Sequence, residues 1–66
     1  MNETMNIFKQ VTKHGKNYIW QDLLFRQDEK GKYTVIKNNI ELAHWKIKTV
    51  YDVAHCIEIM QLNGEI

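Results

Sequence analysis

The sequence contains no proline, no serine and a single cysteine, Cys56. One cysteine excludes an internal disulfide, and an unpaired thiol within an apolar stretch is typical of a reducing compartment, so we expect a cytoplasmic protein. The lack of serine excludes a serine nucleophile. The lack of proline leaves the chain without its strongest breaker of helices and strands, so nearly continuous secondary structure is expected.

Long apolar runs are also missing. No run approaches the roughly 18 residues that a membrane span needs, and residues 1–6 lack the basic and apolar regions of a signal peptide. The sequence therefore predicts a protein that is neither exported nor bound to a membrane. Eight lysines against one arginine indicate the codon bias of an AT-rich genome, such as that of a low-GC bacterium, its phage or a mobile element.

Metal ligands are scarce and scattered. His14, His44, His55 and Cys56 show none of the paired spacings of a zinc site, so we expect neither a metal nor a cofactor. A chain of 66 residues buries only about 60% of its unfolded surface, and domains of this size usually depend on a disulfide, a metal, self-association or very good packing. Good packing and self-association remain.

The pattern of apolar residues predicts one small α+β domain over residues 1–66, with residues 1–4 disordered or loosely attached. We expect a small antiparallel β-meander of three to four strands packed against one C-terminal α-helix. The predicted strands cover residues 5–12, 18–27, 32–37 and 40–48. A short helix is the alternative for residues 40–48, because their apolar residues also fit a helical stripe.

Turn residues separate these strands. Gly15 lies in a predicted turn at 13–17, and Asn38-Asn39 tolerates the left-handed conformation of a tight hairpin. A four-residue loop at 28–31 would pair Gln27 with Lys32 and Arg26 with Tyr33. In that register both faces of the hairpin are apolar: Ile19, Leu23, Phe25 and Ile36 on one, and Tyr18, Trp20, Leu24, Tyr33 and Val35 on the other.

The C-terminal segment carries the clearest signals. Thr49 and Asp52 form a predicted capping box, and Gly64 supplies the stop, which predicts a helix over residues 50–62. One helical face is apolar and should pack on the sheet: Val50, Val53, Ala54, Cys56, Ile57 and Met60. A second stripe carries Tyr51, His55, Ile59 and Leu62, where a surface helix is ordinarily polar.

Apolar surface therefore exceeds what one helix of 13 residues can cover, which predicts a partner. We expect self-association, most simply a homodimer, through the Tyr51, His55, Ile59 and Leu62 stripe or through the Trp20 and Tyr33 face of the hairpin. A larger protein partner is a further expectation. The alternative is that the sheet curls strongly, or that residues 40–48 fold back over the second face.

Charge is unevenly distributed. Residues 1–48 hold all nine basic residues against five acids, a net charge of +4, and residues 49–66 hold three acids and no base, a net charge of −3. A basic, aromatic sheet face could lie against DNA or RNA, since lysines neutralise phosphates and aromatic rings stack on bases. The residues expected to form that face are Lys16, Tyr18, Arg26, Lys32 and Lys37.

Catalytic groups do not converge in the sequence. Cys56 and His55 are neighbours, but adjacent residues on a helix point about 100° apart, so they do not form a nucleophile and base pair. No glycine-rich phosphate loop occurs. We expect no enzyme. The leading hypothesis is a self-associating protein interaction module with an accessory, regulatory or inhibitory role, and the alternative is a small nucleic-acid-binding protein.

Overall fold

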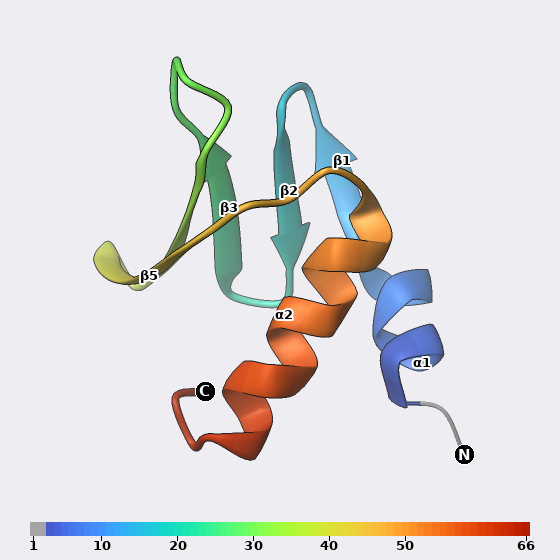
Figure 1. Cartoon of the computed structure of the whole chain (residues 1–66). Coiled ribbons are helices and arrows are strands. Elements are labelled where there is room, and N and C mark those ends of the chain that lie inside the picture. The colour runs from blue at the N-terminus through green and yellow to red at the C-terminus, as the bar shows by residue number, and fades with distance from the viewer. Residues whose placement is uncertain (1–2) are drawn as a thin grey trace.

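The computed structural model describes residues 3–66, and residues 1 and 2 lie outside the described part. It has two helices and a five-stranded sheet (Figure 1), in the order α1 (Glu3–Gln10), β1 (Thr12–His14), β2 (Asn17–Trp20), β3 (Leu23–Gln27), β4 (Tyr33–Lys37), β5 (Ile40–Trp45) and α2 (Val50–Leu62). The sheet is an antiparallel meander with strand order β1-β2-β3-β4-β5. The predicted fold class is confirmed, with one or two more strands than expected.

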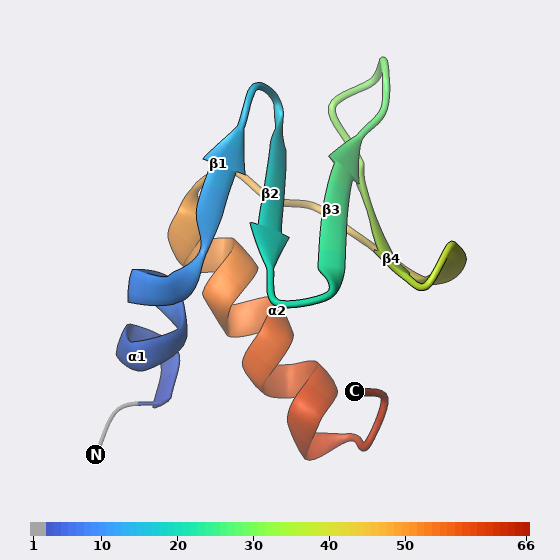
Figure 2. The same cartoon turned by 180° about the vertical axis from the view of Figure 1, so that it is seen from behind.

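The first element is a helix, and the prediction of a strand over residues 5–12 was wrong. Helix α1 runs through Gln10, and β1 begins only at Thr12. Ile7, Phe8 and Val11 are spaced so that a helix places them on one side. Ile7 is 2% exposed, and Phe8 and Val11 pack against the core. This α1 lies alongside α2 (Figures 1 and 2), so tertiary contact decides its structure.

The predicted single strand over residues 18–27 is two strands. Residues 21 and 22 form a tight turn, and Trp20 pairs with Leu23 directly across it. Gln21 has a φ of 53°, in the left-handed region that a residue with a side chain rarely adopts. Neither glycine nor asparagine marks this turn, which explains why the sequence pattern concealed it.

The next loop is one residue longer than predicted, and this changes the register. The Asp28 backbone N–H donates to the Lys32 carbonyl at 2.8 Å, and the Asp28 carboxylate accepts from the N–H groups of Lys30 and Lys32, both at 2.9 Å. Gln27 therefore pairs with Tyr33 instead of Lys32. A slip of one residue moves every side chain to the opposite face.

The predicted division of the hairpin into two apolar faces was consequently wrong. The two turns bring the large residues of β2, β3 and β4 to the face that packs on the helices, and all six are buried: Tyr18, Trp20, Leu23, Phe25, Tyr33 and Val35. The aliphatic residues between them point to the other face and are half-buried: Ile19, Leu24 and Ile36.

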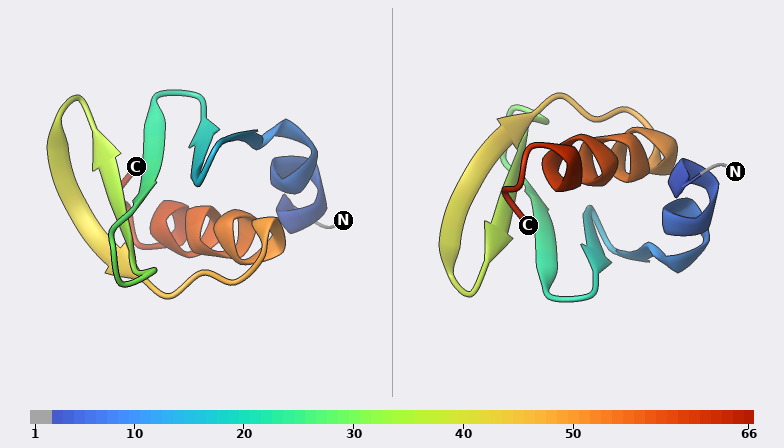
Figure 3. Two further views of the ribbon diagram at one scale, coloured as in Figure 1. Left: turned by 90° about the horizontal axis from the view of Figure 1, so that it is seen from above. Right: turned by 90° about the horizontal axis from the view of Figure 1, so that it is seen from below.

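The segment after Asn38-Asn39 is a strand, β5, and not the short helix that was the alternative prediction for residues 40–48. Asn38 and Asn39 have φ values of 53° and 65°, the left-handed conformation expected of this turn, and β5 ends at Trp45 instead of residue 48. A bulge between β4 and β5 leaves Leu42 unpaired and bends the strand. Figure 3 shows β4 and β5 curling away from β2 and β3 around one side of α2.

Helix α2 follows the prediction from end to end. The Thr49 side chain accepts from the Asp52 N–H at 3.4 Å, and the Asp52 carboxylate accepts from the Thr49 N–H at 3.2 Å, which completes the capping box. Gly64, with a φ of 74°, ends the helix. The predicted core face is confirmed: Val53, Ala54, Cys56, Ile57 and Met60 are 0% exposed, and Val50 packs against them.

Candidate functional site

The second stripe of α2 lies at the surface of the molecule. The capping box and the fully buried core face together fix the rotation of the helix, so the opposite side is turned outward. Leu62 is 82% exposed and Tyr51 is 46% exposed, His55 is exposed, and Ile59 is half-buried. None of these four side chains carries a formal charge at neutral pH when histidine is neutral.

Helix α1 covers one end of this stripe. The rings of Phe8 and Tyr51 lie 5.7 Å apart between centroids, tilted by 49°, which is a favourable aromatic arrangement. Met5, on the same helix, is 38% exposed. The sequence pattern predicted no second helix, so this partial cover was not expected. The stripe is therefore shielded at Tyr51 and open toward Leu62.

The other predicted interface residues, Trp20 and Tyr33, lie in the core. They are 7% and 6% exposed, and both find polar partners within the chain. The Trp20 indole N–H donates to the Gln10 side-chain oxygen at 3.0 Å, and the Tyr33 hydroxyl donates to the Lys16 carbonyl at 3.0 Å. Burial raises the pKa of Tyr33, and the neighbouring Tyr18 raises it further. These rings are occupied by intramolecular packing.

The outer face of the sheet carries a short aliphatic row. Ile19, Leu24 and Ile36 pair across β2, β3 and β4, and all three are half-buried. Both helices lie on the opposite side (Figure 2), so within residues 3–66 no helix covers this row. Polar pairs flank it: Arg26 and Glu41 lie 3.9 Å apart, and Thr34 and His44 lie 3.1 Å apart.

Cys56 is unsuited to catalysis. Its side chain is fully buried, its thiol donates to the Met60 sulfur at 3.8 Å, and His55 on the same helix is exposed. Burial, with a smaller contribution from Glu65, raises the pKa of Cys56 to about 12, so the thiolate that nucleophilic chemistry needs is not formed at neutral pH. Among the side chains that the structure describes, residues 5–66, no group of three or more metal-ligating residues comes together.

The five residues predicted to contact nucleic acid do not form one face. Tyr18 is buried on the inner face of the sheet, with the Lys13 ammonium 5.9 Å from its ring centroid. Arg26 lies on the outer face near Glu41, and Lys37 lies 3.9 Å from Asp22. Of the remaining two, Lys16 sits in the β1–β2 turn and Lys32 in the β3–β4 loop.

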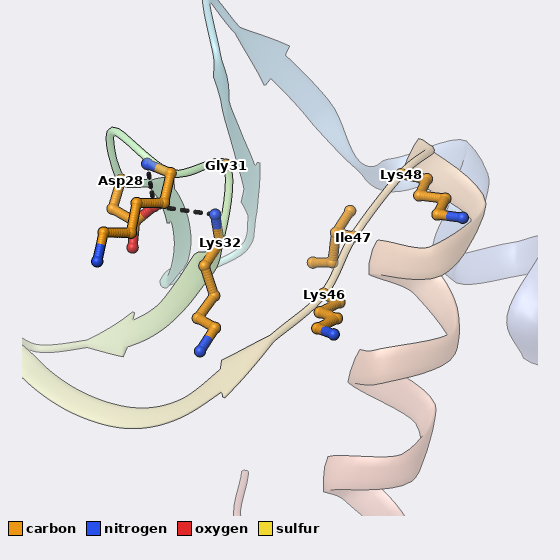
Figure 4. A pocket seen from close by; sticks show the side chains of 7 residues that line it. Asp28, Gly31, Lys32, Lys46, Ile47 and Lys48 are labelled. Atoms are coloured by element: carbon orange, nitrogen blue, oxygen red, sulfur yellow. Dashed lines mark hydrogen bonds between the residues drawn. The ribbon is translucent and has the colours of Figure 1, made fainter.

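Lysines do gather at a different place. A pocket of about 470 Å³ lies between the β3–β4 loop and the segment that leads from β5 to α2. Figure 4 shows Lys32 on the loop side, Lys46 and Lys48 on the segment side, and Ile47 between the two lysines of that segment. Lys30 and Asp28 complete the loop side. The sequence carried a signal for this pocket, two Lys-X-Lys triplets, at 30–32 and 46–48.

Comparison with protein-family models, with curated proteins and with solved structures found no match to this chain. Neither helix of the described residues has both the length and the apolar character needed to cross a membrane. Three surfaces of the molecule remain as candidate sites: the α2 stripe, the outer face of the sheet and the lysine pocket.

Proposed function

We propose that this protein is a non-enzymatic interaction module that self-associates as a homodimer through the outer stripe of α2, formed by Tyr51, His55, Ile59 and Leu62. It would serve as an accessory or regulatory protein, with an inhibitory role toward a larger partner as one form of that function. The observation that carries the proposal is the exposure of Leu62, 82%, at the open end of a stripe without charged residues.

Three features support a second copy of the chain as the partner. Exposed large apolar residues concentrate on the two helices, since Met5, Tyr51 and Leu62 are three of the four in the described chain. The four residues of the stripe carry no lysine, arginine or acid, and the half-buried Glu58, one turn before Leu62, lies at the edge of the stripe, where it stays in water at the rim of the interface. A two-fold axis would also place the same patch on both sides of the interface, as most homodimers do.

The proposal excludes Trp20 and Tyr33 from the interface, because both are already buried by the chain itself. The aliphatic row on the outer face of the sheet is smaller and only half-exposed. The helical stripe, with Tyr51 and Leu62, therefore carries the more exposed apolar side chains of the two surfaces.

Leu62→Glu tests the proposal with little risk to the fold, because the side chain is largely in water. The wild-type protein should scatter light as twice the 7.9 kDa chain, and Leu62→Glu should shift it to the single chain by placing a charge in the interface. Gln61→Glu is the matched control, since it adds the same charge at the neighbouring exposed position off the stripe. It should leave the dimer intact.

Ile59→Glu provides a second variant on the same stripe, closer to its middle. It should dissociate the dimer as well. A wild-type protein that scatters as a single chain at high concentration would refute self-association, and a dimer that survives both Leu62→Glu and Ile59→Glu would place the interface elsewhere.

A further inference from the structure

The pocket between the β3–β4 loop and the segment from β5 to α2, here called the lysine pocket, is lined by four positive charges and only one negative charge. Lys30, Lys32, Lys46 and Lys48 line it, and none of them forms an ion pair with an acid of residues 5–66. Asp28 is the one acid of the lining, so the pocket keeps a net charge of about +3. Figure 4 shows the ammonium groups of Lys32, Lys46 and Lys48 spread along the pocket, and this distributed positive charge would attract an anion with several charged groups.

The loop side of the pocket has a defined shape. The Asp28 carboxylate accepts from the backbone N–H groups of Lys30 and Lys32, and these bonds lower its pKa, so the carboxylate stays ionised near neutral pH. Asp28 is thereby engaged with the loop backbone. The two lysines leave the loop on a backbone that is already ordered, which reduces the entropy cost of binding.

The segment side has a fixed backbone too. Ile47 is 8% exposed and packs into the core, so its neighbours on either side, Lys46 and Lys48, are directed to the surface. Immediately after it, the Lys48 N–H donates to the Asp52 carboxylate of the α2 capping box at 2.9 Å. Figure 4 shows the apolar side chain of Ile47 between the two lysines.

We propose that this pocket binds a phosphate-bearing ligand through Lys30, Lys32, Lys46 and Lys48. The pocket contains lysines and no arginine, and lysine acts on phosphate as a point charge, whereas planar pairing with carboxylates favours arginine. A volume of about 470 Å³ suits a compact ligand with several phosphates. The site uses none of the residues of the α2 stripe, so it is independent of self-association.

A calorimetric titration of the wild-type protein with inorganic tripolyphosphate at low salt tests the proposal. Binding should be saturable, and Lys32→Ala combined with Lys46→Ala should weaken it about tenfold or more, since each lysine is a charged donor. The matched control combines Lys9→Ala with Lys16→Ala, which removes the same charge from exposed positions outside the pocket. It should change the affinity less than about twofold.

Amide chemical shifts of the wild-type protein locate the site without any substitution. On addition of tripolyphosphate, the largest changes should fall on Gly31 and Ile47. Absence of saturable binding at low salt, equal weakening by both double variants, or largest changes elsewhere in the chain would each overturn the proposal.

Two further titrations identify the chemistry of the ligand. Hexaglutamate should bind more weakly than tripolyphosphate, and equal or tighter binding would overturn the assignment to phosphate. A single-stranded oligothymidylate that binds more tightly than tripolyphosphate, and loses that binding in the pocket variant, would assign the phosphates to a nucleic acid. Weaker binding would assign them to a small phosphorylated molecule.

Discussion

Two regions of this chain differ in what determines their secondary structure. One is helix α2, and the other is the N-terminal region from α1 through β3. In α2 the cap, the capping box, the stop and the apolar face all lie within the segment itself. In the N-terminal region, α1 depends on contact with α2, and the β2–β3 turn uses Gln21 at a φ of 53°. Local signals therefore specify one part of this fold, and tertiary contacts specify the other.

The largest effect should come from Ile7→Ala, which tests whether α1 belongs to the core. Ile7 is 2% exposed, so its truncation should lower the free energy of unfolding by about 2–4 kcal/mol, measured by urea denaturation. Met5→Ala on the same helix is the control, because Met5 is 38% exposed and should change stability far less. Equal effects of the two would mean that α1 does not pack as described.

A smaller gain should follow from Gln21→Gly, which tests the concealed turn. Glycine adopts a positive φ without steric cost, so the variant should be more stable by about 0.5–1 kcal/mol. Gln21→Ala keeps the side-chain carbon that causes the cost and should give no gain. A loss of stability in Gln21→Gly would show that residues 21 and 22 do not form this turn.

The smallest effect concerns pH and the start of α2. The N–H groups of Lys48 and then Thr49 donate to the Asp52 carboxylate and lower its pKa below the unfolded value. The stabilisation is therefore fully present above about pH 4 and is lost as the pH falls through the folded pKa. Urea midpoints measured down to about pH 2 should fall less steeply in Asp52→Asn than in the wild-type protein. An unchanged slope would contradict this role of Asp52.

The same division applies to the candidate sites. The α2 stripe could be predicted because helical spacing alone brings Tyr51, His55, Ile59 and Leu62 to one side. The lysine pocket could not be predicted in full, because its two triplets meet only after the chain has folded through β4 and β5. Trp20 and Tyr33 were misplaced because they depend on the register.

The fold class, the bounds and core face of α2, and the turn at Asn38-Asn39 could all be predicted from the sequence. Each follows from side chains that act within a few residues of themselves, through caps, left-handed turn residues and helical spacing. The helical conformation of Ile7 and the inward orientation of Trp20 depend instead on contacts between distant parts of the chain. Strand residues alternate with a period of two, so the turn at residues 21 and 22 and the extra residue in the loop after Asp28 together placed β3 on the opposite face from the predicted one, relative to β2 and β4.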